Sequence, residues 1–181
     1  MLLTFALDRV VFVDETAVYT HMDRRYGYAR RGKRVVRRVK SRPTRYTLIG
    51  AMRMGQMLAK RVWPRGMKEA DWLVWLKEDL LPALEPGSIV IWDNLNIHYN
   101  AEGIELLEKN GHVVLFQSRY SPDFNPIEKG WSKVKAFLRR ARPRGAAQLR
   151  AALDKAWEAI TPNDITGYFD CTVQYILEPL W

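Results

Sequence analysis

The sequence predicts a mixed α/β domain in which helices pack on a central sheet. Short runs of apolar, β-branched residues are typical of buried strands, and one such run occupies residues 10–13. Similar runs occupy residues 89–92 and 113–116, and helix-like segments lie between and after them. The predicted order is strand, hairpin, helix, strand, helix, strand and further helices, which favours a sheet covered by helices.

Apolar periodicity and breaker residues define the remaining elements. Two apolar runs, 46–54 and 56–63, meet at Gly55 and predict a hairpin. The helix predicted over residues 68–81 brings apolar side chains to one face, namely Trp72, Trp75, Leu76 and Leu80. The later helices are predicted over residues 101–109, 126–140, 147–160 and 163–175. The second of these carries an apolar stripe at helical spacing that is expected in the core, namely Ile127, Trp131, Val134 and Leu138.

The composition excludes several classes of protein. Of 181 residues 48% are apolar, enough for a real core, so disorder is excluded for most of the chain. No apolar run approaches the roughly 20 residues that cross a bilayer, and no signal peptide is recognised, so no membrane partner is expected. A single cysteine, Cys171, excludes an internal disulfide and a cysteine-based zinc site. A reducing cytoplasm is the expected location of such a chain.

Positive charge is concentrated in two stretches. The net charge is +9, from 29 basic and 20 acidic residues. Residues 24–45 contain eleven basic and no acidic residues, and residues 129–150 contain eight basic and no acidic residues. This pattern favours a polyanionic partner, most simply nucleic acid, although composition alone does not separate DNA from RNA or a membrane surface.

Two acids share one context, VVFVD for Asp14 and IVIWD for Asp93. If these strands are parallel neighbours, both carboxylates end a strand at the same sheet edge, and Glu128 can reach it from the next helix. Each carboxylate pair at ~4 Å costs roughly 1 kcal/mol in water and about 4 kcal/mol at an effective dielectric of 20, so such a cluster requires cations. Hard oxygen ligands select Mg²⁺ or Mn²⁺. The ordinary alternatives are turn or capping aspartates and a capping-box glutamate.

Three sequence blocks carry a family resemblance. The segments VDET, WDNLNIH and RYSPDFNPIEKGWSKVK resemble the DDE transposases of the mariner superfamily, in particular the bacterial insertion-sequence branch. The block SPDFNPIE-x-x-W is the most specific of them. Thirty-four residues separate Asp93 from Glu128, a spacing typical of that group. The resemblance covers roughly residues 8–141.

The resemblance implies a ribonuclease H-like fold, a mixed five-stranded sheet with helices on both faces. It also implies that Asp14, Asp93 and Glu128 form the catalytic triad and bind two Mg²⁺ (or Mn²⁺) ions per site. Water would cleave a DNA phosphodiester, and the freed 3′-hydroxyl would attack target DNA in a homodimer. Two alternatives stay open: a ribonuclease H-like nuclease without strand transfer, and an inactive DNA-binding remnant of a transposase.

The chain departs from complete transposases of this group, which carry helix-turn-helix modules before the catalytic domain. Here the first catalytic strand begins near Met1. We therefore expect an isolated catalytic domain, a truncated copy, or half of a split reading frame whose partner is a separately encoded helix-turn-helix polypeptide. Residues 1–145 are expected to form the catalytic domain, with a basic loop at about 20–45, and residues 146–181 a C-terminal helical extension.

Further residues are expected to support the acids or bind DNA. Strand alternation points Glu15 to the face opposite Asp14, where it is expected to support the site or to form a salt bridge with an arginine. Asn94 is expected to orient Asp93 or the scissile phosphate, or to be a turn amide. His98 matches the histidine of the family motif, which implies contact with DNA or with a metal-bound water. A structural role for His98 is the alternative. The candidate DNA-binding residues are Arg30, Arg31, Lys33, Arg34, Lys135 and Arg139.

Overall fold

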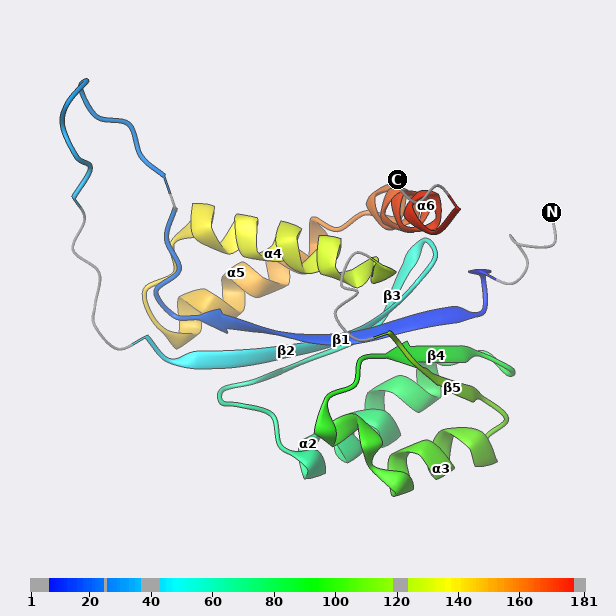
Figure 1. Cartoon of the computed structure of the whole chain (residues 1–181). Coiled ribbons are helices and arrows are strands. Elements are labelled where there is room, and N and C mark those ends of the chain that lie inside the picture. The colour runs from blue at the N-terminus through cyan, green and yellow to red at the C-terminus, as the bar shows by residue number, and fades with distance from the viewer. Residues whose placement is uncertain (1–6, 25, 37–42, 119–123, 178–181) are drawn as a thin grey trace.

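The chain forms one mixed sheet between two layers of helices (Figure 1). A computed structural model describes residues 7–24, 26–36, 43–118 and 124–177. The five strands lie in the order β3-β2-β1-β4-β5. Their bounds are β1 Val10–Tyr19, β2 Arg45–Arg53, β3 Gln56–Trp63, β4 Ile89–Trp92 and β5 Val113–Phe116. The five-stranded mixed sheet with helices on both faces is therefore confirmed.

The central strand β1 joins an antiparallel half of the sheet to a parallel half. It pairs antiparallel with β2, which forms the predicted hairpin with β3, and Gly55 adopts the positive φ of 74° that the turn requires. On its other side β1 pairs in parallel with β4, and β4 pairs in parallel with β5. The carboxyl ends of β4 and β5 therefore open at one edge of the sheet, beside the middle of β1.

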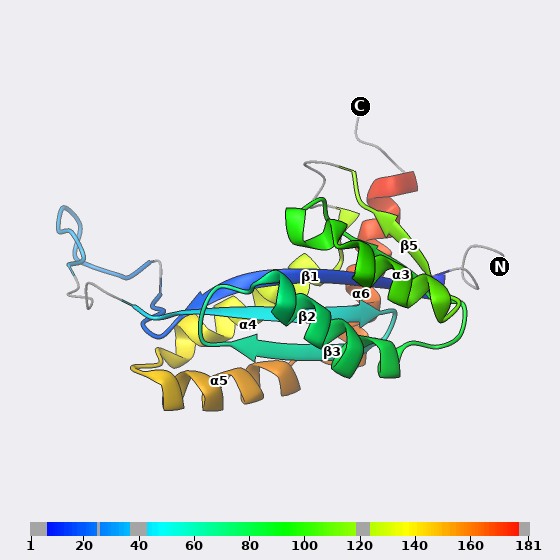
Figure 2. The ribbon, with the colours of Figure 1, turned by 90° about the horizontal axis from the view of Figure 1, so that it is seen from below.

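Helices cover both faces of the sheet (Figure 2). One face carries α2 Glu69–Trp75, which continues through a π-helical turn Leu76–Leu80 and a 3-10 turn Leu81–Ala83, and α3 Ala101–Lys109. A further 3-10 turn, Asn96–Tyr99, follows β4. The opposite face carries α4 Ile127–Ala141, α5 Ala146–Glu158 and α6 Pro162–Leu177. Among the described residues, no helix is both long and apolar enough to span a membrane.

Alternate residues of β1 supply two separate cores. Val11 and Val13 pack with the buried Trp72 and Trp75 under α2 and α3. Phe12 packs on the other face with the buried apolar stripe of α4 and with α6, where the rings of Phe12 and Phe169 meet at 5.6 Å. The boundary proposed at residue 145 stays a prediction, but α5 and α6 share this second core with α4.

One strand differs from its prediction in a way that matters for the site. The apolar run of β1 ends at Val13, and the expectation that Asp14 terminates the strand was wrong, because β1 continues to Tyr19. The antiparallel ladder with β2 runs from the pair Phe12–Met52 to the pair Tyr19–Arg45 and keeps the polar residues extended. Asp93, by contrast, directly follows β4, as predicted.

The basic loop between β1 and β2 extends away from the sheet (Figure 1). At its base Asp23 forms ion pairs with Arg144 at 2.8 Å and with Arg142 at 3.6 Å, both just after α4. The described loop residues from Tyr26 to Val36 are exposed. Residues 25 and 37–42 of this loop lie outside the described residues. The C-terminal end of α4 is thus tied to the base of the loop.

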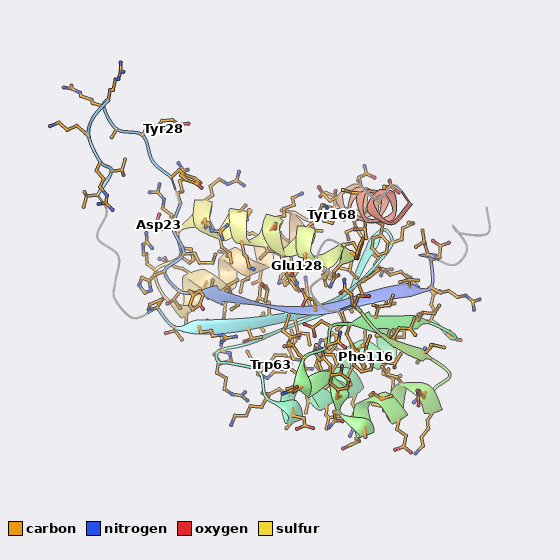
Figure 3. All side chains as sticks on the ribbon, in the orientation of Figure 1. Asp23, Tyr28, Trp63, Phe116, Glu128 and Tyr168 are labelled. Atoms are coloured by element: carbon orange, nitrogen blue, oxygen red, sulfur yellow. The ribbon has the colours of Figure 1, made fainter. Side chains whose placement is uncertain are left out.

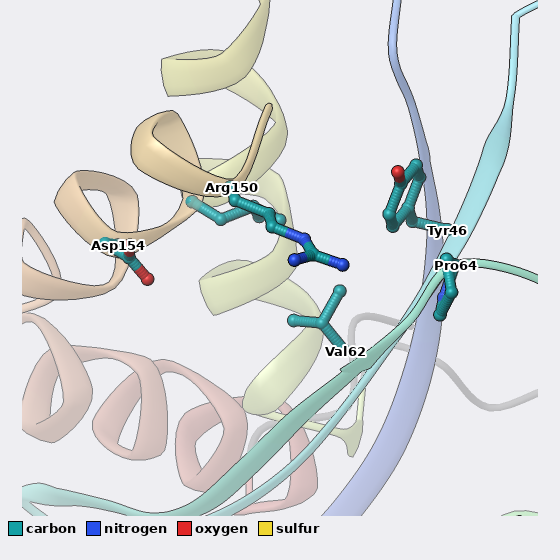
Figure 4. A pocket seen from close by; sticks show the side chains of 6 residues that line it. Tyr46, Val62, Pro64, Arg150 and Asp154 are labelled. Carbon is teal, nitrogen blue, oxygen red and sulfur yellow. The ribbon is translucent and has the colours of Figure 1, made fainter. Parts of the chain in front are cut away.

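A cavity of about 210 Å³ lies between the β2–β3 hairpin and α5 (Figure 4). None of the predicted site residues lines it. Its walls are formed by Tyr46, Val62, Pro64, Arg150, Leu153 and Asp154.

Candidate active site

Asp14 lies in the middle of β1 and faces α4. The residue is 8% exposed, and the indole Nε1 of Trp131 donates a hydrogen bond to its Oδ2 at 2.9 Å. Trp131 reaches this position because Gly50, the β2 residue paired with Asp14, carries no side chain. A Cβ atom on Gly50 would lie 3.0 Å from the Cη2 atom of Trp131, so the glycine admits the ring. A strand, its neighbour and a helix together fix this carboxylate.

Asp14 has a strongly perturbed acidity. Burial raises its pKa well above the ordinary value, and the negative charges of Glu128 and Glu15 raise it further. Hydrogen bonds from the Glu15 backbone and from Trp131 oppose this rise without cancelling it. Asp14 is therefore a buried carboxylate, and the charged groups that act on it among the described residues are other carboxylates.

Glu128 lies in the first turn of α4 and is half-buried. Asn125 precedes the helix, and its Oδ1 accepts a hydrogen bond from the backbone N–H of Ile127 at 3.3 Å. This contact holds the backbone at the start of α4, where the N-cap residue is Pro126. The residues just before Phe124, which belong to the family-like block, lie outside the described residues. Figure 3 shows Glu128 over the central part of the sheet.

Asp93 has the opposite electrostatic setting. Its Oδ1 accepts hydrogen bonds from the backbone N–H of Leu95 at 3.0 Å and from His98 Nδ1 at 2.6 Å. Burial on its own would raise the pKa of Asp93, but the hydrogen bonds from His98 and Leu95 outweigh burial and lower it. Asp93 is thus held as a carboxylate with a cation beside it.

His98 bridges two carboxylates beneath the sheet edge. It is fully buried, its Nε2 lies 3.3 Å from Oε2 of Glu15, and its ring packs on Trp72 with centroids 4.3 Å apart. Burial favours the neutral ring, but hydrogen bonds to Asp93 and Glu15 outweigh burial and raise the pKa of His98 to about 9. A pKa of about 9 favours the imidazolium form at neutral pH, and the side chain is fully buried between the two carboxylates.

Asn94 joins the ends of β4 and β5. Its Nδ2 donates to the backbone oxygen of Gln117, and its Oδ1 accepts a hydrogen bond from Tyr99 Oη at 2.6 Å. Asn94 therefore acts through its neighbours, by fixing the backbone next to Asp93. Tyr99 was not recognised as a site residue in the sequence.

The structure brings the predicted acids together in two groups. Asp14 and Glu128 are electrostatically coupled on the α4 side, whereas Asp93 pairs with His98 and Glu15 on the α2–α3 side. Within the described ranges, no three acidic, histidine or cysteine side chains lie close enough to hold one metal ion. The donor set nevertheless fits a hard divalent cation, because it consists of carboxylate oxygens and Asp14 lacks a compensating charge.

The candidate DNA-binding residues lie along α4 and in the loop. Lys135 and Arg139 are half-buried on α4, which runs from Glu128 toward the base of the basic loop (Figure 1). The loop residues among the candidates are exposed around a turn closed by a hydrogen bond from Lys33 N–H to the Arg30 oxygen; they are Arg30, Arg31, Lys33 and Arg34. One helix therefore connects the acids to the positively charged loop.

Sequence reasoning missed the second role of Trp131. The residue was assigned to the apolar stripe of α4 and is indeed fully buried, but its indole N–H also binds Asp14. A signal was present, since the specific block SPDFNPIE-x-x-W contains this tryptophan three residues after Glu128. The ion pairs of Asp23 with Arg142 and Arg144 were also missed, because no local sequence pattern predicts them.

Comparison with known proteins places these observations in a family. Residues 9–150 match a family described as DDE superfamily endonuclease. A search of curated proteins finds no significant match. Among solved structures, the chain is similar to a Mos1 transposase paired-end complex with the left transposon end, with a TM-score of 0.79, 19% identity, and coverage of 93% of this chain and 53% of that chain.

Two further structures give the same result. A Mos1 mariner paired-end complex with Mn matches with a TM-score of 0.76, 18% identity, and coverage of 94% of this chain and 55% of that chain. The isolated catalytic domain of Mos1 mariner transposase matches with a TM-score of 0.68, 18% identity, and coverage of 93% and 77%. The chain spans about half the length of the first two transposase chains. At these identities, the similarity establishes the shared fold.

Proposed function

Because this chain belongs to the DDE superfamily of endonucleases, we propose that it cleaves DNA strands and joins the freed 3′ ends to other DNA. The proposed catalytic carboxylates are Asp14, Asp93 and Glu128. The observation that carries the proposal is the setting of Asp14, which is buried, held by Trp131 and placed where Glu128 repels its charge. Such an arrangement costs stability unless a cation offsets it.

The cation we propose is Mg²⁺ or Mn²⁺, with two ions per site, held by the three carboxylates. When bound, such ions activate an attacking oxygen and stabilise the leaving oxygen of a phosphodiester. Support comes from the oxygen-only donor set and from similar transposase complexes that contain Mn or Mg.

Residues of the chain fix two of the three carboxylates, Asp14 and Asp93, before substrate binds. The indole of Trp131 orients Asp14 through Oδ2. The imidazolium of His98 keeps Asp93 ionised and orients it, and Glu15 balances the charge of His98 from the other side. Asn94 ties the backbone next to Asp93 to the end of β5. These contacts keep Asp93 charged and hold Asp14 and Asp93 in place, which is the preorganisation that phosphoryl transfer requires.

DNA is the proposed partner, along a path from the acids to the basic loop. Lys135 and Arg139 on α4, with the loop residues between Arg30 and Arg34, supply positive charge along this path. The fold is that of transposases solved in complexes with transposon ends, which supports this assignment. A homodimer and a separately encoded helix-turn-helix polypeptide are part of the same proposal.

A strand-transfer assay tests the function. The full chain is incubated with Mn²⁺, a labelled duplex that ends in a 3′-hydroxyl, and a supercoiled plasmid. Joined product that is lost in Glu128→Gln supports the proposal. Plasmid nicking without joining indicates a nuclease that lacks strand transfer. If neither joining nor nicking occurs and calorimetry detects no Mn²⁺ binding in the millimolar range, the chain is an inactive remnant.

A further inference from the structure

An exposed pair of aromatic rings lies at the carboxyl ends of β4 and β5. Tyr99 is 49% exposed and Phe116, the last residue of β5, is 36% exposed. Their rings are nearly parallel, with centroids 4.6 Å apart and an interplanar angle of 10°. Phe116 is labelled in Figure 3, on the α2–α3 side of the sheet. Aromatic rings contribute favourable stacking energy when a second flat ring covers their face. A flat ligand that stacks on this pair would therefore bind favourably.

The pair is held rigidly from behind. Phe116 packs edge-on against the buried Trp92 at 6.1 Å, and Tyr99 stacks on Phe116 as the outermost ring of this series. The hydroxyl of Tyr99 donates to Oδ1 of Asn94 at 2.6 Å. One face of the Tyr99 ring is covered and its hydroxyl is bonded, which leaves the opposite ring face toward solvent. A ligand that stacks there would meet a preorganised ring and would immobilise few additional side-chain torsions.

The rings lie next to a proposed catalytic acid. Asn94, which holds Tyr99, directly follows Asp93, and Phe116 pairs across the sheet with Trp92, which directly precedes Asp93. The rings therefore adjoin the residues on both sides of Asp93, so a nucleotide whose phosphate lies at Asp93 would have its base near the pair. Every nucleobase has a flat π-face, and stacking on aromatic side chains is tolerant of sequence.

The geometry points to Tyr99, backed by Phe116, as a stacking site for an unpaired base beside the phosphate that is cleaved or joined. This inference rests on the proposed function, because it takes Asp93 to act on DNA. Stacking on Tyr99 would keep an unstacked base out of the duplex and so hold the adjacent phosphate at the acids. Such a site recognises that a base has left the duplex, and it does not distinguish one base from another.

A second copy of the chain is the competing occupant. Other apolar side chains near the rings are also exposed, including Leu95 and, on the edge strand β5, Val113 and Leu115. The described part of the sheet ends at β5, so a protein partner could pair with this edge. A base is favoured because the rings adjoin Asp93 and because the chain carries a net charge of +9.

Binding to two single strands with equal numbers of phosphates tests the stacking site. One is oligothymidine and the other is an abasic strand of the same length, and fluorescence anisotropy without metal reports both affinities. We expect the protein to bind oligothymidine about five- to hundredfold more tightly, the range that stacking of one base supplies. Tyr99→Leu keeps an apolar side chain but removes the flat ring, and should abolish the preference while leaving abasic affinity unchanged. Tyr99→Phe should retain the preference.

Three outcomes overturn the inference. Equal affinity of the unaltered protein for the two strands, or binding to neither, excludes a base-stacking site. Retention of the preference in a folded Tyr99→Leu variant places the stacking elsewhere. The third outcome is self-association of the protein that Val113→Lys abolishes. If Tyr99→Leu at the same time leaves the preference for oligothymidine unchanged, the exposed apolar patch is a protein interface. None of these readouts needs cleavage, so a failure of the catalytic proposal is seen separately, in the strand-transfer assay.

Discussion

Two consecutive residues of β1 show opposite ways of burying a carboxylate. Asp14 faces α4, where its charged neighbours are further carboxylates, and its pKa is raised. Glu15 faces α2 and α3, where the imidazolium of His98 lies 3.3 Å away and also binds Asp93. One face of the strand thus concentrates negative charge, and the other compensates it with a protein cation.

The comparison shows where an external cation is needed. A pair of carboxylates at ~4 Å costs about 1–4 kcal/mol, depending on the local dielectric. On the α2–α3 side, His98 removes this cost within the fold. On the α4 side, only the neutral donor Trp131 and backbone groups assist Asp14. In the proposed metal site, the negative charge that would favour binding of a divalent cation therefore lies mainly on the α4 side.

The largest expected effect comes from removing one charge on either side of β1. Asp14→Asn should lower metal-dependent DNA cleavage by about a thousandfold or more, since it removes a proposed ligand. The same change should raise metal-free stability by roughly 1 kcal/mol, because it relieves repulsion while the amide oxygen still accepts from Trp131. Cleavage assays and urea unfolding measure the two effects.

Glu15→Gln is the matched control for this change. It removes the same charge one residue further along the strand, and it should lower stability by roughly 1 kcal/mol, because His98 loses a partner. If both substitutions change stability in the same direction, the contrast between the two faces is wrong.

Removal of the cation on the compensated face should have the next largest effect. His98→Gln leaves Glu15 and Asp93 without their positive partner, and should lower the free energy of unfolding by about 2–3 kcal/mol. His112→Gln is the control, because His112 is also buried but forms no described ion pair, and it should cost less than about 1 kcal/mol. Equal losses in the two variants would show that burial, and not charge compensation, sets the effect of His98.

A smaller effect is expected from Trp131→Phe. The change keeps an aromatic ring over Gly50 but removes the indole donor to Asp14. Hydrogen bonds to charged groups contribute about 1.5–3 kcal/mol to stability. The free energy of unfolding should therefore fall by about 1.5 kcal/mol. Cleavage should fall about tenfold as Asp14 loses its orientation. In the Asp14→Asn background the stability loss should shrink, and an undiminished loss would mean that Trp131 acts only by packing.

The smallest effect concerns an acid on the α4 side that does have a cation. Lys133 Nζ lies 2.6 Å from Oδ2 of Asp164, which also accepts from the Thr161 backbone, and the pKa of Asp164 is lowered to about 2. A lowered pKa contributes stability that is present above about pH 4 and is lost as the pH falls toward 2. Asp164→Asn should cost roughly 0.5 kcal/mol at pH 7, since the pair is partly solvated.

Urea unfolding at pH 7 and at pH 3 checks this last prediction. The difference between the unaltered protein and Asp164→Asn should narrow at pH 3. A difference that grows on acidification would contradict the assigned cause of the shift.

The contrast also explains what could be predicted from the sequence. Strand alternation correctly placed Glu15 opposite Asp14, and apolar spacing correctly identified the buried faces of α2 and α4. The length of β1 was not predictable from its own residues, because its polar half is held by β2 beyond a long loop. The bond from Trp131 to Asp14 spans 117 positions and depends on the packing of α4 over Gly50. Local patterns specify the elements, whereas charge compensation arises only when they meet.

Gly50 has a consequence that reaches beyond its own strand. Even a methyl group at this position would meet the indole at 3.0 Å and displace it by some tenths of an ångström. That displacement would be passed to the carboxyl group of Asp14 and to the first turn of α4, where Glu128 resides. Gly50, which has no reactive atom, thus determines how accurately the carboxyl groups of Asp14 and Glu128 are positioned. The substitution Gly50→Ala would displace the proposed catalytic carboxylates without altering any of them chemically.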